Sequence, residues 1–273
     1  MTKVSVPGLH RMKRDSQKIT GVVAWDYQMA QIADRAGVDL VSVGDTVGKN
    51  LWGQSNPLEV TMDQMVVVSQ AVRRGVERAI VSVDYPYGPL QLGLDAAVRA
   101  AIRFVKEAGV DMVKLDGAAD YPEAVEAIDR AGIPVFAQIG ITPQTALRYG
   151  MDYTSMASPD AHVPERMAEQ LVAEAVRMEG AGAAMIDFTN SGPIVGPRVV
   201  EAVSIPVVGG FGGGPWLDGR VRMAHAAIGY GAATLDREVD TYAQVARIAL
   251  DALSEFADDV RSGRQIRGGV RTG

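Results

Sequence analysis

One pattern recurs along this chain: a short apolar, β-branched run, then polar or glycine-rich residues, then an alanine-rich helical segment. Such an alternation predicts parallel strands joined by helical crossovers. The apolar runs fall at residues 19–24, 39–44, 79–83, 112–115, 133–137, 184–186, 207–209 and 232–235. The predicted helices fall at residues 27–36, 62–74, 94–108, 122–131 and 164–181.

The ends of four predicted helices share a second signal. AGV stands at residues 36–38 and 108–110, AGI at 131–133 and AGA at 181–183. The glycine is expected in the left-handed conformation that ends a helix, and the next strand begins at once. The repeat of roughly 25–35 residues has the size of one β/α unit.

Eight β/α units need about 250 residues, and this chain has 273. We therefore predict an α/β fold in which residues 1–273 form a single (β/α)₈ TIM barrel with parallel strands. A short N-terminal extension and a flexible, basic C-terminal tail are expected at its ends. A doubly wound open sheet is the competing architecture, but eight units and the lack of an early dinucleotide-binding glycine fingerprint favour the barrel.

Composition excludes several classes of protein. The net charge is −6, so we expect no nucleic-acid partner. The absence of cysteine excludes disulfides, a thiolate nucleophile and cysteine-ligated metals. No signal-peptide core is visible, and no apolar run approaches the roughly 18 residues of a membrane span. We expect a cytoplasmic protein without a membrane partner.

Polar residues stand where the predicted strands end, which is where barrels place their active sites. These residues are Asp45, Asp84, Lys114, Asp116, Gln138 and Asp187. Four crowded acids repel one another unless they are neutralised: Lys114 can neutralise one, and a divalent cation two more. Because oxygen ligands favour Mg²⁺ or Mn²⁺ over zinc, the pattern predicts a hard metal at the mouth of the barrel.

Each residue also has an ordinary structural interpretation. Asp45 and Asp187 could cap helices, Asp84 could form a turn, and Lys114 could pair with Asp116. An entirely structural set is the less favoured interpretation, because all of these residues lie at the same end of the predicted barrel.

Two loops leave alternatives open. Residues 148–162 form either a lid or a surface loop. Residues 209–214 either bind a phosphate or carboxylate through backbone N–H groups or are only a mobile glycine loop. His10, His162 and His225 stand away from the strand ends. We therefore expect a site without a histidine base, in which aspartate carries the protons.

The motifs GDTVG (44–48), VDYPYG (83–88), KLDG (114–117) and GITPQ (140–144) resemble the ketopantoate hydroxymethyltransferase family of the phosphoenolpyruvate/pyruvate barrel superfamily. The resemblance covers about residues 19–231. It implies a homo-oligomer, commonly a decamer. It also implies that a 2-oxo acid enolate attacks the one-carbon unit of 5,10-methylenetetrahydrofolate.

The resemblance also implies roles for single residues. Asp45 and Asp84 match the aspartates that hold Mg²⁺, which in turn chelates the 2-oxo acid. Thr46 matches a serine that binds the substrate carboxylate, and Lys114 matches a lysine near the oxo acid. We assign substrate binding to Gly44, Thr46, Lys114 and Gln138, and catalysis to Lys114, Asp116 and Asp187.

The chain departs from the family at four of these positions. The family has glutamate at the positions of Asp116 and Asp187, histidine at that of Gln138 and serine at that of Thr46. We therefore expect a Mg²⁺-dependent, aldol-type hydroxymethyltransferase with an altered substrate shell, acting on a 2-oxo acid other than the ketopantoate precursor. Two alternatives stay open: a metal-dependent 2-oxo acid lyase (retro-aldolase or decarboxylase), and a non-catalytic barrel.

Overall fold

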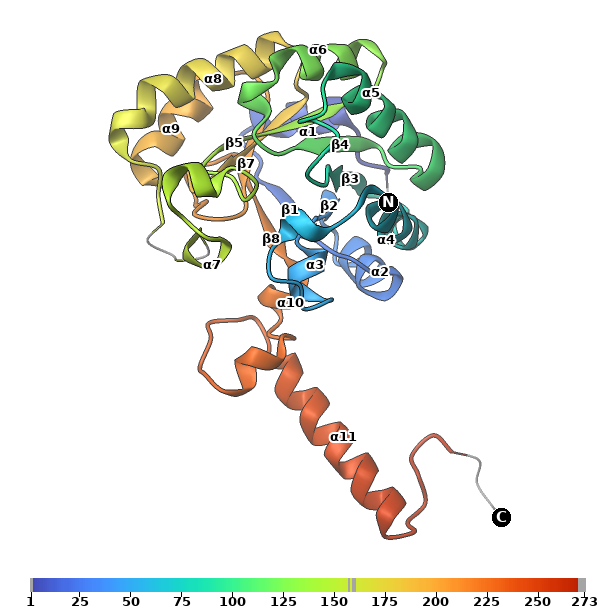
Figure 1. Cartoon of the computed structure of the whole chain (residues 1–273). Coiled ribbons are helices and arrows are strands. Elements are labelled where there is room, and N and C mark those ends of the chain that lie inside the picture. The colour runs from blue at the N-terminus through green and yellow to red at the C-terminus, as the bar shows by residue number, and fades with distance from the viewer. Residues whose placement is uncertain (1, 157, 159–160, 270–273) are drawn as a thin grey trace. The chain divides into compact units, whose positions relative to one another are not determined.

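Eight parallel strands form a closed barrel in the order β1 to β8 in the computed structural model (Figure 1), which confirms the predicted fold. The structure describes residues 2–156, 158 and 161–269. The strands are β1 (Ile19–Val23), β2 (Leu40–Val43), β3 (Ile80–Asp84), β4 (Met112–Leu115), β5 (Val135–Gly140), β6 (Met185–Thr189), β7 (Val207–Gly209) and β8 (Gly219–Met223).

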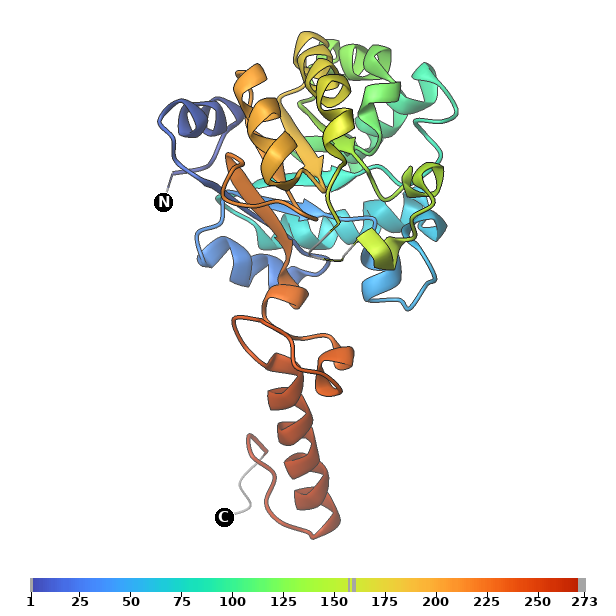
Figure 2. The ribbon, with the colours of Figure 1, turned by 90° about the vertical axis from the view of Figure 1, so that its left-hand side faces the viewer.

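Helices lie outside the strands of the barrel (Figure 2). The α-helices are α1 (Val6–Arg14), α2 (Tyr27–Arg35), α3 (Val47–Asn50), α4 (Met62–Gly75), α5 (Leu94–Arg103), α6 (Pro122–Arg130), α7 (Tyr153–Met156), α8 (Ala168–Gly180), α9 (Gly192–Ala202), α10 (Ala224–Ala227) and α11 (Val245–Arg261). The short helices are η1 (Pro57–Glu59), η2 (Phe104–Ala108), η3 (Ala118–Asp120), η4 (Ala146–Tyr149), η5 (Glu165–Met167) and η6 (Ala232–Leu235). In the described part of the chain, none of the helices has the length and apolarity to cross a bilayer.

The glycines at the four predicted helix ends have the expected left-handed backbone conformation. Gly37, Gly109, Gly132 and Gly182 have φ values of +88°, +67°, +80° and +94°. L side chains rarely adopt these angles, so glycine at these four positions lets the chain leave a helix and enter the next strand within two or three residues.

The eighth predicted strand was misplaced. Residues 232–235 form the short helix η6, and the strand is β8, with the sequence GRVRM. Arg220 and Arg222 alternate with buried positions along β8. These two charged residues break the apolar run by which the other strands were found.

An apolar cluster closes the end of the barrel at which the strands begin. Leu9 of α1 packs there with one residue from each strand: Ile19, Leu40, Ile80, Met112, Phe136, Met185, Val208 and Val221. The N-terminal extension therefore contributes to the core, and the polar strand ends are left to the opposite face.

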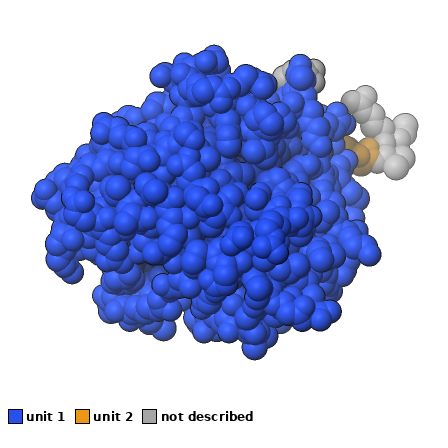
Figure 3. Space-filling view, turned by 90° about the horizontal axis from the view of Figure 1, so that it is seen from above, with its two compact units in different colours: residues 1–222 blue, residues 223–273 orange. Residues whose placement is uncertain are grey.

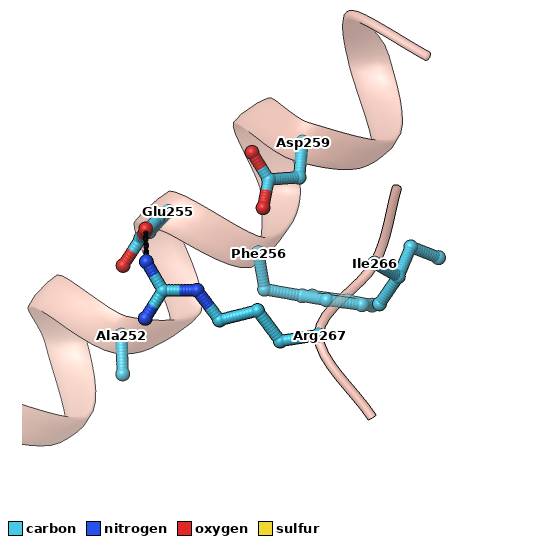
Figure 4. Close-up of a pocket in the computed structure, with 6 residues that line it drawn as sticks. All are labelled: Ala252, Glu255, Phe256, Asp259, Ile266 and Arg267. Carbon is cyan, nitrogen blue, oxygen red and sulfur yellow. Dashed lines mark hydrogen bonds and ion pairs between the residues drawn. The ribbon is translucent and has the colours of Figure 1, made fainter. Parts of the chain in front are cut away.

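The chain divides into two compact units, Met1–Arg222 and Met223–Gly273, coloured separately in Figure 3. In the second unit, α11 carries exposed apolar side chains, among them Ile248, Leu253 and Phe256. Figure 4 shows a small pocket between α11 and the segment that follows it, lined by Ala252, Glu255, Phe256, Asp259, Ile266 and Arg267. The single-domain organisation stays a prediction, and the last four residues of the predicted tail lie outside the described residues.

Asp34 of α2 binds the segment that leads into β3. Its carboxylate accepts hydrogen bonds from the backbone N–H groups of Glu77 (3.0 Å), Arg78 (3.1 Å) and Ala79 (2.8 Å). Burial opposes ionisation, but these donors and the charge of Arg78 lower the pKa of Asp34 below its ordinary value.

We expect Asp34→Ala to lower the free energy of unfolding by about 3 kcal/mol, because three N–H groups lose their acceptor. Since the folded pKa is depressed, the carboxylate stabilises the fold above its ordinary pKa, and this contribution is lost as the pH falls through the folded value. Urea unfolding of both proteins at neutral and acidic pH measures the effect. A variant as stable as wild type at neutral pH would contradict it.

Candidate active site

The strand register brings the predicted site residues together. Parallel pairing places Asp84 beside Lys114 and Gln138 beside Asp187. All six predicted strand-end residues are buried at the carboxyl ends of β2 to β6. The structure therefore gathers the residues that the sequence singled out.

Lys114 bridges two acids from different strands. Its Nζ lies 3.3 Å from Oδ2 of Asp84 and 3.1 Å from Oδ2 of Asp187. Burial alone opposes the charge, but the two carboxylates raise the pKa of Lys114 above its ordinary value. Lys114 thus carries a fixed positive charge, and its ion-pair partners are these two acids rather than Asp116.

Asp45 and Asp84 are two buried acids that Lys114 neutralises only in part. Burial raises the pKa of Asp45 well above its ordinary value, and repulsion from Asp84 and Asp116 raises it further. Burial also raises the pKa of Asp84, although Lys114 opposes the rise. Asp84 accepts hydrogen bonds from Ser42 Oγ (3.4 Å) and from the backbone of Asp45. Two buried carboxylates that repel each other fit a hard divalent cation.

Among the described residues, no group of three or more acidic, histidine or cysteine side chains has the arrangement of a metal site. Asp45 and Asp84 would therefore leave further ligand positions to water or substrate oxygens. Mg²⁺ commonly binds in this way, through one or two carboxylates.

Asp116 is held from the loop that follows β5. Thr142 Oγ1 donates to its Oδ1, and the backbone N–H of Gln144 donates to its Oδ2 at 3.2 Å. Burial raises the pKa of Asp116 to about 7, against the effect of these two donors. A carboxyl group with this pKa can accept or donate a proton at neutral pH.

We expect Asp116 to make the metal-free protein less stable as the pH rises. Its folded pKa of about 7 lies above the ordinary value of 3.8, so the folded state binds the proton more tightly. The stabilisation is complete below the ordinary pKa and is lost as the pH rises through about 7; such a shift corresponds to about 4 kcal/mol. Asp116→Asn should lack this part of the pH dependence. Urea unfolding in EDTA measures it, and identical pH profiles for both proteins would contradict it.

Gln138 and Asp187 differ in how their polar atoms are engaged. Gln138 Nε2 donates to Thr189 Oγ1 at 2.7 Å, which fixes the amide. Asp187 Oδ1 is buried and has no hydrogen-bond partner among the described residues, whereas Oδ2 pairs with Lys114. The free oxygen of Asp187 is available to a bound molecule.

Gly44 and Thr46 shape the end of β2. A Cβ atom at Gly44 would lie 2.7 Å from Thr46 Oγ1 and 2.9 Å from Val23 Cγ1, so only glycine fits. Thr46, rather than Asp45, is the N-cap residue of α3, and its side chain makes no capping hydrogen bond. Likewise Ser191, not Asp187, precedes α9. The two aspartates are therefore not helix caps.

Residues 148–162, for which the sequence left a lid or a surface loop open, contain α7, and residues 157 and 159–160 lie outside the described residues. Tyr153 packs edge-on against Phe211 at 5.7 Å, and Lys49 Nζ lies 5.4 Å from the centre of its ring. Burial raises the pKa of Tyr153 to about 12, and the charges of Asp45 and Asp84 contribute to the rise. This segment therefore lies against the loops that follow β2 and β7, close to the acids.

Sequence reasoning missed Thr142, Gln144 and Tyr153. The first two belong to the GITPQ segment, but no pattern of strand ends could assign a role to loop side chains. Of the histidines, His10 binds the Ala184 carbonyl at 2.7 Å, and His162 is exposed.

Comparison with known proteins gives a consistent result. The family model described as ketopantoate hydroxymethyltransferase matches residues 3–265. A 3-methyl-2-oxobutanoate hydroxymethyltransferase of Salinibacter ruber is 36% identical over 261 residues and covers 96% of each chain. The enzyme of the same name from Pyrococcus abyssi is 38% identical over 255 residues, which cover 92% of this chain and 86% of that protein.

Two solved structures share the fold at low sequence identity. A 2,3-dimethylmalate lyase of the PEP mutase/isocitrate lyase superfamily has a TM-score of 0.60 and 16% identity, covering 98% of this chain and 90% of that one. A phosphonopyruvate hydrolase in complex with oxalate and Mg²⁺ has a TM-score of 0.58 and 16% identity, covering 97% and 89%.

Proposed function

Because the chain belongs to the ketopantoate hydroxymethyltransferase family of one-carbon transferases, we propose that it adds a hydroxymethyl group to a 2-oxo acid in a magnesium-dependent, aldol-type reaction. The observation that carries this proposal is the buried pair Asp45 and Asp84 beside the charged Lys114. We propose a homo-oligomer, as the family resemblance implies, and light scattering measures its size.

Asp45 and Asp84 would hold Mg²⁺ or Mn²⁺ through carboxylate oxygens. A bound metal would polarise the 2-oxo group and stabilise the negative charge that develops when a C3 proton leaves. In this proposal the Thr46 hydroxyl and the backbone at Gly44 bind the substrate carboxylate. Lys114 adds a fixed positive charge to the same mouth.

Proton transfer falls to an aspartate in this site. Asp116 has the pKa of about 7 that suits a base at neutral pH. Asp187 is the other candidate because its Oδ1 is unpaired. Gln138 cannot exchange a proton at neutral pH, so its fixed amide can only orient substrate.

The one-carbon donor is 5,10-methylenetetrahydrofolate in this proposal, with free formaldehyde as the simpler source. Asp116, Asp187 and the Gln138 amide differ in length and charge from the glutamates and histidine that the family resemblance implies, and they would shape a different pocket around C3. We therefore propose a 2-oxo acid other than 3-methyl-2-oxobutanoate as the preferred substrate.

Proton NMR in D₂O tests the first chemical step. Pyruvate, 2-oxobutyrate and 3-methyl-2-oxobutanoate are each incubated with protein and Mg²⁺, with and without EDTA. We expect metal-dependent loss of a C3 proton signal, with rates that rank the substrates. If no oxo acid exchanges while the folded protein binds Mg²⁺, the proposal is wrong.

A second measurement separates transfer from cleavage. Addition of 5,10-methylenetetrahydrofolate or formaldehyde to the best exchanging substrate should yield the hydroxymethyl product. Release of pyruvate from a larger oxo acid without a one-carbon donor would instead indicate a lyase.

A further inference from the structure

Gln144 lies at the junction of three strand ends. Gly140, with φ +95°, turns the chain out of β5 beside β6, where a Cβ atom would lie 2.3 Å from the Thr189 carbonyl oxygen. The segment that follows crosses the mouth of the barrel. Gln144 Nε2 donates to Oδ2 of Asp45 at 3.0 Å and to the carbonyl of Tyr85 at 2.8 Å.

The amide of Gln144 has one orientation that fits. Both atoms that face Nε2 are acceptors, so the opposite orientation would place Oε1 against a carboxylate and a carbonyl. Its two N–H groups are therefore both used. Gln144 thus contacts two acids of the site: its side chain donates to Asp45, and its backbone N–H donates to Asp116.

The loop that carries Gln144 has anchors other than the Gln144 side chain. Thr142 binds Asp116 through its hydroxyl, and its Oγ1 lies 2.7 Å from Thr145 Oγ1. The Thr145 N–H donates to the Thr142 carbonyl at 3.1 Å. These bonds do not involve the Gln144 amide, whose two N–H groups go to Asp45 and to the Tyr85 carbonyl.

We propose that Gln144 is a positioning residue: it fixes one oxygen of Asp45, so that the other would be left for a metal ion, and it ties this acid to the loop that holds Asp116. The inference rests on the proposed function, because it assumes a divalent metal at Asp45 and Asp84. Residues that orient metal ligands by hydrogen bonds typically change metal affinity by about 10–100-fold when they are replaced.

Gln144→Met is the sharpest variant, because it keeps the length of the side chain and removes both donors. The matched control is Gln70→Met on α4. Gln70 lies away from the site, and its Nε2 donates to the Glu107 carbonyl at a distance of 2.9 Å. We expect Gln144→Met to weaken Mn²⁺ binding, followed by electron paramagnetic resonance, by about tenfold or more. The rate constant for C3 exchange should fall more than the KM changes. Gln70→Met should match wild type in both measurements, and the two variants should have similar melting temperatures.

Thr142→Val provides a second test, because it removes the hydroxyl bond to Asp116 but keeps the backbone bond from Thr145 to the Thr142 carbonyl and the Gln144 amide itself. It should lower the exchange rate while Mn²⁺ affinity stays within about twofold of wild type. Mn²⁺ affinity unchanged in Gln144→Met, or reduced equally in Gln70→Met, would overturn the inference. If the wild-type protein binds Mn²⁺ and exchanges C3 hydrogens, either of these outcomes contradicts the role of Gln144 and leaves the proposed function intact. If the wild-type protein neither binds Mn²⁺ nor exchanges C3 hydrogens, the proposed function itself is wrong.

Discussion

Asp45→Asn should reduce magnesium-dependent exchange of the C3 hydrogen by on the order of 10³-fold. The amide has nearly the shape of the carboxylate, and its oxygen can still accept the hydrogen bond from Gln144. What it lacks is the charge that, with Asp84, makes this end of the barrel attractive to a divalent cation. The exchange rate by NMR and the Mn²⁺ affinity by electron paramagnetic resonance should therefore fall together.

The matched control is Asp95→Asn, which removes an exposed carboxylate on α5 that pairs with Arg99 one helical turn away. It should leave exchange and Mn²⁺ affinity at wild-type values. If Asp45→Asn kept half of the wild-type exchange rate at limiting Mg²⁺, Asp45 would not be a metal ligand, and the acids would need another explanation.

Lys114→Met should lower the free energy of unfolding by about 3–5 kcal/mol. The substitution keeps most of the side-chain volume but leaves Asp84 and Asp187 buried without their shared cation. Without Lys114, the Asp84 carboxylate would take up a proton more readily, so the loss should grow as the pH rises. Urea unfolding of the metal-free protein at several pH values measures this.

Two comparisons make the Lys114 result interpretable. Arg99→Met breaks the exposed pair with Asp95 and should cost no more than about 0.5 kcal/mol. Adding Asp187→Leu to Lys114→Met removes one of the two carboxylates that lost their cation, and should recover part of the lost stability. A Lys114→Met protein as stable as Arg99→Met would show that the ion-paired cluster is not buried in solution.

The sequence identified seven of the eight strands because each of these has an apolar run of its own. It missed β8, since Arg220 and Arg222 alternate there with buried residues and erase the pattern. The helix ends were predictable at Gly37, Gly109 and their equivalents, because the left-handed backbone at a helix end favours one residue type.

The strand-end rule likewise found Asp45, Asp84, Lys114, Asp116 and Asp187, because a barrel brings all its carboxyl ends to one face. Composition and alternation thus determined the architecture and the mouth at which the polar residues meet. They could not determine which polar atoms pair with which, since pairing depends on the stagger between neighbouring strands and on where the loops fold back.

Only the tertiary structure decided that Lys114 joins Asp84 to Asp187, and that Gln144 reaches Asp45 from a loop 99 residues further along the chain. Burial also gives Asp116 its near-neutral pKa, and burial is a property of the packed barrel rather than of the aspartate. The physical reason is the same in each case: local sequence fixes backbone preferences, whereas charge and proton affinity depend on neighbours that are remote in the chain.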